Sequence, residues 1–390
     1  MALTQTGVPV SRPPSYYIRQ RLWSNKPAMA GLAVIIIAAL IAILGYLILP
    51  DSTPNANNSI VQLQKKPPGF AVKVLRVPQQ NQAAEKTNII SQMLFGAKKN
   101  YSEIPISHYK IVGDTLFAEP FDQNKALPQE IIKLPVSELD EENSRLNEKQ
   151  NNLTLVHTKR YWLGTDNAGR DVLSRLFLGT RISLGIGLVA VLISVLLGIT
   201  VGAIAGYFGG ALDKLMLFFM TVVWSVPSIM LVIAISLALN SKGIWVTFVA
   251  VGLTMWVDVA RIVRGQFLSL KEKTYIEAAT VLGLPRYRII LNHLLPNMTG
   301  PLIVIATANF ASAILIEAGL SFLGLGVQPP APSWGMMVSE GFQLIGAKAG
   351  LFLVLFPSVL ISLLVLSFNL LGNGLRDAYD PKILLTSAHG

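Results

Sequence analysis

The sequence predicts an all-α polytopic membrane protein with six transmembrane helices and an inserted extracytoplasmic domain. Of its 390 residues, 52% are hydrophobic and only 14% are charged, whereas soluble domains carry about a quarter charged residues. The mean hydropathy is +0.52. A chain of this composition would expose too much apolar surface in water. It also contains apolar runs of about 20 residues, which is the length that crosses a hydrocarbon core of roughly 30 Å.

The first apolar run, residues 28–49, contains no charged residue. It is long for a signal peptide and lacks an A-x-A cleavage site, so we expect a retained anchor. The other spans are expected at 183–207, 215–239, 244–263, 301–320 and 350–371. Asp258 and Arg261 weaken the fourth span, and their i, i+3 spacing predicts a local ion pair. Six spans place both termini on one side of the membrane.

Basic residues indicate which side that is, because Lys and Arg concentrate in short cytoplasmic segments. The segment 1–27 has four basic residues and no acidic one: Arg12, Arg19, Arg21 and Lys26. The segment 264–300 has five, against Glu272 and Glu277: Arg264, Lys271, Lys273, Arg286 and Arg288. We therefore expect both termini, including a short tail 383–390, to be cytoplasmic. The net charge of +10 then reflects topology and not binding to nucleic acid.

Residues 50–160 differ in composition from the rest and are expected outside the cytoplasm. They hold most of the acidic residues, with strand-like alternation at 70–77 and 108–112. Residues 137–150 are highly charged, which is typical of an exposed helix or a linker. The stretch is therefore expected to be either a small α/β domain of about 100 residues or a partly disordered loop. The transport core would be residues 161–382.

No cofactor site is predicted in this chain. Cysteine is absent and the four histidines are far apart in sequence, which argues against a metal centre. Gly185-x-Gly187-x-x-Ala190 matches a dinucleotide-binding pattern, but it lies inside a predicted span with no strand before it. Gly198, Gly202 and Gly206 recur every four residues, which favours close helix packing over a hinge.

The segment from Glu277 to Asn297 predicts a short helix–turn–helix between two spans. Glu277, Ala278 and Ala279 would lie in the exposed first turn of a short helix that Gly283 ends, and Pro285 would open the next helix. Held between two membrane helices, such a unit could transmit force from a cytoplasmic partner. A basic connecting loop is the alternative that physical arguments alone leave equally open.

The order E-A-A, three residues, Gly, then I-x-x-x-x-L-P resembles the cytoplasmic signature of permease subunits of binding-protein-dependent ABC importers. Further segments resemble the C-type permease of the dipeptide/oligopeptide/nickel branch, in register over about residues 160–382: 163–175 (LGTDNAGRDVLSR), 205–210 (AGYFGG), 317–326 (EAGLSFLGLG), 329–335 (PPAPSWG) and 368–377 (FNLLGNGLRD). Members of the branch usually reach the LGTD motif soon after the first span. Here more than a hundred residues intervene.

The resemblance implies a peptide permease of type I ABC importer architecture in the bacterial inner membrane. It also implies four kinds of partner: a second homologous permease subunit, one or two cytoplasmic ATPase subunits, an extracytoplasmic binding protein and membrane lipid. The chain has no phosphate-binding loop of its own, so ATP would be used by the ATPase subunit and this chain would not be an enzyme. The implied coupling surface consists of Glu277, Ala278, Ala279, Gly283, Leu284 and Arg286.

Glu317, Ser321 and Trp334 are candidates for the translocation path or its gate. A carboxylate in a span is costly in hydrocarbon, so Glu317 should face a cavity, a partner or water. Substrate recognition, a structural or gating role and simple interfacial exposure stay open for it.

Two other classes of protein stay open as well. A secondary transporter or channel would need inverted repeats or several buried ionisable residues in its spans. An envelope structural protein would work through residues 50–160.

Overall fold

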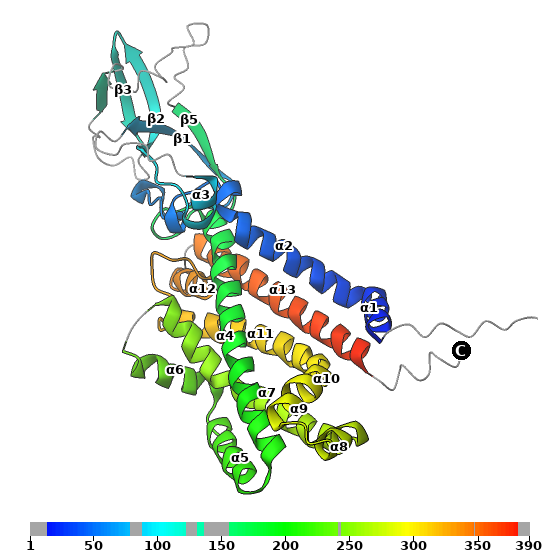
Figure 1. Ribbon diagram of the computed structural model, residues 1–390. Coiled ribbons are helices and arrows are strands. Elements are labelled where there is room, and N and C mark those ends of the chain that lie inside the picture. Colours follow the sequence, from blue (N-terminus) through cyan, green and yellow to red (C-terminus); the bar gives the residue numbers. More distant parts are fainter. Residues whose placement is uncertain are drawn as a thin grey trace, which may run out of the picture.

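The computed structural model describes residues 14–78, 88–121, 131–135, 156–240, 243–346 and 348–380. A bundle of helices carries a small β-sheet at one end (Figure 1). Helices α1 (Pro14–Ser24) and α2 (Lys26–Ile48) begin the chain, which then leaves the bundle to form the sheet. It returns through α4 (Val172–Phe208), a helix of 37 residues that runs from the sheet toward the opposite end of the bundle.

The remaining helices complete the bundle, and their bounds are α5 (Gly210–Trp224), α6 (Ser228–Ala238), α7 (Ile244–Lys271), α8 (Thr274–Val281), α9 (Arg286–Ile289), α10 (Leu295–Asn297), α11 (Thr299–Phe322), α12 (Trp334–Phe342) and α13 (Lys348–Tyr379). Five helices of the described chain, α2, α4, α7, α11 and α13, are long and apolar enough to cross a membrane. The pair α5 and α6 makes a sixth span if it is counted as one.

The predicted span at 215–239 is not one continuous helix, because α5 and α6 meet at an angle of 91°. The break falls at Ser225, Val226 and Pro227. Proline has no N–H to donate and restricts the backbone of the residue before it. Hydropathy registers only how apolar a segment is, so it cannot distinguish a bent pair from a straight span.

Helix α4 starts before the predicted residue 183, because its first turns lie outside the apolar run. Asp171 caps it by accepting a hydrogen bond from the Ser174 N–H at 2.8 Å. Cap residues of this kind satisfy N–H groups that have no partner within the helix.

Close packing of α4 on α7 confirms the predicted role of the three spaced glycines. A Cβ atom on Gly202 would lie 2.5 Å from the Ala260 carbonyl oxygen and 2.7 Å from Val263 Cβ. Gly198 and Gly206 meet α7 in the same way. Small residues let two helix backbones approach, which is how helices associate in lipid.

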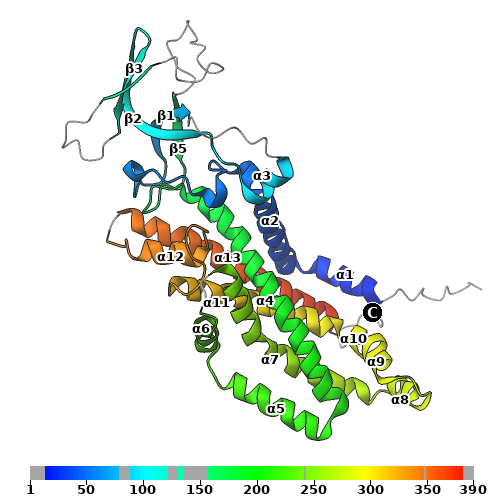
Figure 2. The same cartoon turned by 60° about the vertical axis from the view of Figure 1, so that its left-hand side comes forward.

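Five strands form one antiparallel sheet in the order β4-β3-β2-β1-β5. Their bounds are β1 (Phe70–Pro78), β2 (Tyr101–Val112), β3 (Thr115–Pro120), β4 (Ile132–Pro135) and β5 (Val156–Tyr161). A short helix, α3 (Ile89–Phe95), lies beside the sheet-side end of α2 (Figure 2). The predicted strands at 70–77 and 108–112 fall in β1 and β2. Residues 137–150 and 383–390 lie outside the described chain.

An ion-pair cluster centred on Glu103 of β2 stabilises the described part of this domain. The Glu103 carboxylate accepts from Lys159 Nζ of β5 at 2.6 Å and from Lys99 Nζ at 2.9 Å. It also accepts from Asn58 Nδ2 at 2.8 Å, in the loop that follows α2. The cluster therefore joins the sheet to the chain that leaves the bundle.

Candidate functional site

The segment between α7 and α11 projects from the end of the bundle opposite the sheet (Figures 1 and 2). Two residues separate helix α8 (Thr274–Val281) from α7, and Gly283 follows α8 with a left-handed φ of +74°. Glycine adopts this conformation without the steric cost that other residues carry. Pro285 then precedes α9 and accepts from the Arg288 N–H at 2.9 Å. The predicted short helix–turn–helix is present.

One predicted detail of this segment is wrong, because Ala279 is buried. Helix α8 starts at Thr274, so Glu277 ends its first turn as predicted, whereas Ala278 and Ala279 begin its second half. Ala279 and Ile276, three residues apart, share one face of the helix. They are 5% and 2% exposed and belong to an apolar cluster with Phe267 of α7. This face anchors α8 to the bundle.

The other predicted coupling residues lie toward solvent. Leu284 is half-buried against the same cluster, and the remaining ones are exposed: Glu277, Ala278, Gly283 and Arg286. Large apolar side chains are exposed among them, with Val281 at 88% and Leu282 at 80%. We call the exposed face made by Glu277, Ala278, Val281, Leu282 and Gly283 the α8 surface. Exposed apolar side chains rimmed by charges are typical of a site that binds another protein.

A pocket of about 510 Å³ separates α8 from the turn between α4 and α5. Arg286 lies across it, with its guanidinium carbon 5.8 Å from the centre of the Phe208 ring. Lys271 Nζ, at the end of α7, donates to the Tyr207 carbonyl oxygen at 2.7 Å. These contacts join α4 to the end of α7 and to the start of α9, and the buried face of α8 packs on α7. A displacement of α8 would therefore be transmitted to α7 and through it to α4.

The three candidate path residues lie toward the sheet-side end of the bundle, where α4, α11 and the segment leading into α12 meet. The Glu317 side chain is fully buried. Its carboxylate accepts from Ser321 Oγ at 2.7 Å and from Ser183 Oγ of α4 at 3.4 Å. Interfacial exposure, one of the open alternatives, is therefore wrong for Glu317. Sequence placed Glu317 near a helix end, but could not show that two other helical segments enclose it.

Ser321 and Trp334 each tie this region to a neighbouring segment. Ser321 Oγ accepts from the Val327 N–H at 3.2 Å, so it holds the chain that leaves α11. Trp334, 2% exposed, donates from Nε1 to the Leu176 carbonyl oxygen of α4 at 2.9 Å. Gly179 permits this, because a Cβ atom there would lie 2.7 Å from the Trp334 ring.

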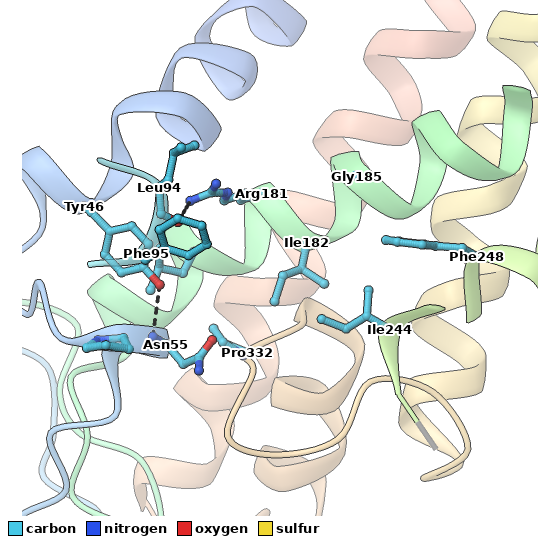
Figure 3. A pocket seen from close by; sticks show the side chains of 12 residues that line it. Tyr46, Asn55, Leu94, Phe95, Arg181, Ile182, Gly185, Ile244, Phe248 and Pro332 are labelled. Carbon is cyan, nitrogen blue, oxygen red and sulfur yellow. Dashed lines mark hydrogen bonds between the residues drawn. The ribbon is translucent and has the colours of Figure 1, made fainter. Parts of the chain in front are cut away.

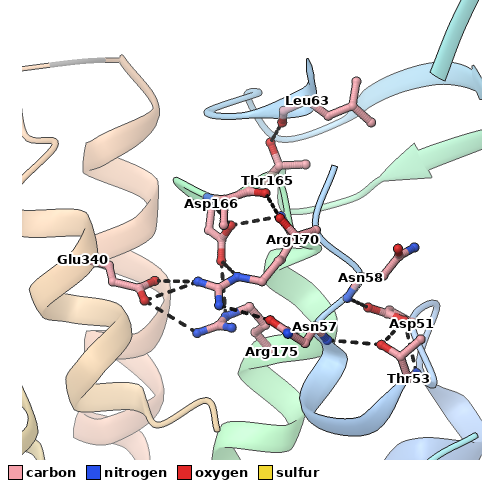
Figure 4. Close-up of polar contacts among 12 residues, drawn as sticks. Asp51, Thr53, Asn57, Asn58, Leu63, Thr165, Asp166, Arg170, Arg175 and Glu340 are labelled. Carbon is pink, nitrogen blue, oxygen red and sulfur yellow. Dashed lines mark hydrogen bonds and ion pairs between the residues drawn. The ribbon is translucent and has the colours of Figure 1, made fainter. Parts of the chain in front are cut away.

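The LGTDNAGRDVLSR motif forms an ion-pair network that joins the start of α4 to α12 (Figure 4). Arg170 Nε lies 2.7 Å from Asp166 Oδ2, and its Nη2 lies 3.3 Å from Glu340 Oε1. Arg175, which is fully buried, lies between the same two carboxylates at 3.3 and 3.8 Å. The two carboxylates lie within ion-pair distance of Arg175, but its three guanidinium nitrogens make no hydrogen bond within the described residues. The sequence motifs do not include Glu340; its position in a largely apolar segment is the signal that could have indicated it.

Near the sheet end, a pocket of about 520 Å³ lies between α3 and the ends of α2, α4 and α7 (Figure 3). Apolar side chains such as Phe95, Ile182 and Phe248 make up most of its lining. Arg181 is the charged side chain that lines it, and it donates to the Leu94 carbonyl oxygen at 2.8 Å.

The structure also tests the predicted Asp258–Arg261 ion pair and the dinucleotide-binding pattern. The predicted ion pair between Asp258 and Arg261 is not among those of the described residues. The guanidinium carbon of Arg261 instead lies 4.4 Å from the centre of the Trp224 ring. The dinucleotide pattern lies in the interior of α4, where a Cβ atom on Gly187 would lie 2.6 Å from the Phe310 ring. The described residues hold no group of three potential metal ligands.

A bundle of bilayer-length helices with a projecting α8 surface defines a helical membrane protein with an exposed surface of the kind that binds other proteins. A family model described as the binding-protein-dependent transport system inner membrane component matches residues 198–385. A second, the N-terminal TM domain of oligopeptide transport permease C, matches residues 14–68. The chain belongs to this family of binding-protein-dependent inner-membrane permeases.

Two permeases related in sequence agree with this assignment. The oligopeptide transport system permease protein OppC of Haemophilus influenzae is 45% identical over 57% of this chain and 70% of its own length. The dipeptide transport system permease protein DppC of Bacillus subtilis is 43% identical over 57% of this chain and 69% of its own. A solved chain of the MetNI methionine ABC transporter, in an inward facing conformation, aligns over 53% of this chain and 98% of its own with a TM-score of 0.45 and 19% identity.

The family assignment indicates the function of this chain. Members are permease subunits of ABC transporters in the inner membrane, and ATP hydrolysis resides in a separate subunit. The chain is therefore a transport subunit and not itself an enzyme. The secondary transporter and the envelope structural protein are set aside.

Proposed function

We propose that this chain imports di- or oligopeptides as one half of a type I permease heterodimer. A binding protein would deliver the peptide from outside, and one or two ATPase subunits would use ATP on the cytoplasmic side. The identity of 45% and 43% with an oligopeptide and a dipeptide permease supports this substrate class. The chain itself would bind no cofactor.

The orientation follows from charge. The α8 end of the bundle and both termini would be cytoplasmic, since basic residues outnumber acidic ones in 1–27 and 264–300. The sheet would then lie outside, on the side from which a binding protein approaches.

The α8 surface is the observation that carries the coupling mechanism. It combines the exposed apolar side chains of Val281 and Leu282 with the carboxylate of Glu277. Two small exposed residues, Ala278 and Gly283, complete it. We expect it to enter a groove on the ATPase. When two ATPase subunits close around ATP, α8 would move with them. Its buried face and the Lys271 contact would pass this motion to α7 and α4, which switches the access of the cavity.

Glu317, Ser321 and Trp334 would act in gating by holding α11, α4 and the start of α12 together at the outer side. Each makes a hydrogen bond to another segment. A change in the relative position of α4 and α11 would have to break or re-form these bonds. This is the structural or gating alternative, and the full burial of Glu317 favours it over direct contact with substrate.

Co-purification tests the coupling step. The tagged chain would be isolated from its native membrane in mild detergent as wild type, as Glu277→Lys and as Asp377→Lys, and its partners identified by mass spectrometry. Asp377 is exposed near the end of α13, so its charge reversal is the matched control. We expect the second permease in all three samples and the ATPase in all but Glu277→Lys. Full ATPase recovery with Glu277→Lys would refute the assigned surface.

Uptake by the reconstituted complex tests the substrate class. Proteoliposomes with all subunits, the binding protein and ATP should accumulate a labelled tripeptide. Competition by unlabelled peptides, and none by a nickel chelate, is the expected result. Accumulation of nickel instead would replace the peptide assignment.

A further inference from the structure

Most of the apolar side chains of helix α3 (Ile89–Phe95) are exposed. Ile89, Ile90, Leu94 and Phe95 are 69%, 61%, 42% and 70% exposed. None of its seven residues is buried and none is charged. A helix this short has little stability of its own in water, and a contiguous exposed apolar surface marks a binding site for a partner or a membrane. Residues 69–197, which include α3, lie outside both family matches.

Specific contacts fix α3 against the sheet-side end of α2. Gly96, which follows it, has a φ of +79°, and a Cβ atom there would lie 2.7 Å from the Ser52 carbonyl oxygen and 2.9 Å from the Tyr46 ring. The Ala97 N–H donates to the same carbonyl oxygen at 2.9 Å. Arg181 of α4 donates to the carbonyl oxygen of Leu94. These contacts hold α3 in one position, and its four apolar side chains are exposed in that position.

Helix α3 lies beside the end of α2 and near the start of α7, two candidate membrane spans. Figure 3 shows Leu94 and Phe95 beside Tyr46, at the end of α2, and on the same side of the pocket as the start of α4, across from Ile244, where α7 begins. The neighbouring Trp245 is 51% exposed. Tyr and Trp are enriched where membrane helices meet water.

The apolar surface of α3 continues the lipid-facing surface of α2. Helix α2 lies at the edge of the bundle in both views (Figures 1 and 2), and it is a candidate membrane span. Between residues 36 and 48 its exposed side chains are all apolar: Ile36, Ile37, Leu40, Ile43, Leu47 and Ile48. Leu47 and Ile48 directly follow Tyr46, whose ring lies against Gly96 at the end of α3.

We propose that α3 is an interfacial helix that buries its four apolar side chains in the outer boundary of the lipid bilayer. The occupant is phospholipid. Short apolar helices that lie at the interface bind through their buried apolar area, and basic residues beside them favour anionic headgroups. Lys98, exposed three residues after Phe95, is placed for that contact. The helix would tether the inserted domain to the membrane and set the height of the sheet above it.

The absence of cysteine from the chain makes the test direct. The full-length chain would be reconstituted in phospholipid nanodiscs as Ile90→Cys, Phe95→Cys and Val112→Cys, each with a nitroxide label. Val112, 55% exposed on β2, is the control for an exposed apolar residue of the sheet. Collision with oxygen, which concentrates in lipid, would be compared with collision with a water-soluble nickel chelate. We expect oxygen to dominate at 90 and 95 and the chelate to dominate at 112.

Chelate dominance at positions 90 and 95 would overturn the proposal. Low access to both reagents at these positions would overturn it too, because it would indicate a protein partner on α3. The unlabelled wild-type chain gives an independent measurement. A phosphatidylcholine with a photoactivatable group near the headgroup should cross-link to the peptide containing residues 89–95, and failure to do so would also count against the proposal.

Discussion

Arg264 of α7 and Asp213 of α5 form a two-point ion pair close to α8. Arg264 Nε lies 2.6 Å from Asp213 Oδ1, and Nη2 lies 2.7 Å from Oδ2. The side chains are 24% and 17% exposed, so solvent limits the strength of the pair to about 1 kcal/mol. Its two parallel bonds nevertheless fix one geometry. The pair holds the bent α5–α6 unit against the helix that leads into the proposed coupling segment.

Replacing Arg264 with Lys should weaken coupling more than stability. Lysine keeps the charge but cannot make two parallel hydrogen bonds to one carboxylate. We expect a change in unfolding free energy of less than about 1 kcal/mol, together with lower peptide uptake per ATP hydrolysed by the reconstituted complex. The exchange Asp213→Arg with Arg264→Asp is the control, since it restores an ion pair. Unchanged uptake per ATP in Arg264→Lys would show that the pair has no part in coupling.

Adding a methyl group at Gly202 should separate α4 from α7. A Cβ atom there would lie 2.5 Å from a backbone oxygen that cannot move alone. Overpacking of this kind costs about 1–3 kcal/mol, so Gly202→Ala should lower the melting temperature of the purified chain. Gly185→Ala is the matched control in the same helix, because a Cβ atom at Gly185 has no neighbour within 4 Å. Equal melting temperatures for both variants would contradict the packing role.

The sequence predicts a membrane span accurately where apolar composition alone determines the helix. It predicts an element less accurately where contacts between residues far apart in the sequence determine its bounds or shape. Helices α2 and α13 are found from their apolar runs, because a charge-free stretch of that length has few alternatives. Strand β2 begins at Tyr101, before the predicted residue 108, since polar residues and Pro105 interrupt its alternation. The bend between α5 and α6 leaves the apolar composition unchanged.

In the candidate site, too, local features follow from the sequence and long-range contacts do not. The helix–turn–helix around Gly283 follows from local backbone preferences, so its sequence predicts it. The burial of Ala279 depends on where α8 begins and on Phe267 of α7. Glu340 contacts Arg170 across 170 residues of sequence. Spacing within a motif carries no information about such a partner, so only the folded chain reveals it.

Removing the Glu317 carboxylate should destabilise the meeting point of α4 and α11. In Glu317→Leu, the buried hydroxyls of Ser321 and Ser183 lose their shared acceptor, and an unsatisfied buried polar group costs about 1–3 kcal/mol. Glu317→Gln keeps an acceptor oxygen and should melt close to wild type. Uptake by the assembled complex separates the roles: normal uptake in Glu317→Gln would exclude a functional need for the charge.

The inserted domain should lose stability in acid through Glu103. Burial raises the pKa of this carboxyl, but Lys159 and Lys99 outweigh that effect and lower it to about 2. A lowered pKa in the folded state means that the stabilisation is complete above the unfolded value, about 4.3, and is lost as pH falls from there toward 2. The loss is on the order of 3 kcal/mol. Amide exchange of β1 and β2, corrected for intrinsic rates, should therefore show falling protection between pH 5 and pH 3.

Two variants decide whether Glu103 is the group responsible. Glu103→Gln should have weaker protection of β1 and β2 at pH 7, because two ammonium groups lose their carboxylate, and should change little between pH 5 and pH 3. Glu119→Gln, at an exposed position of β3, should keep the wild-type profile. If Glu103→Gln retained the wild-type loss of protection in acid, Glu103 would not be the group responsible.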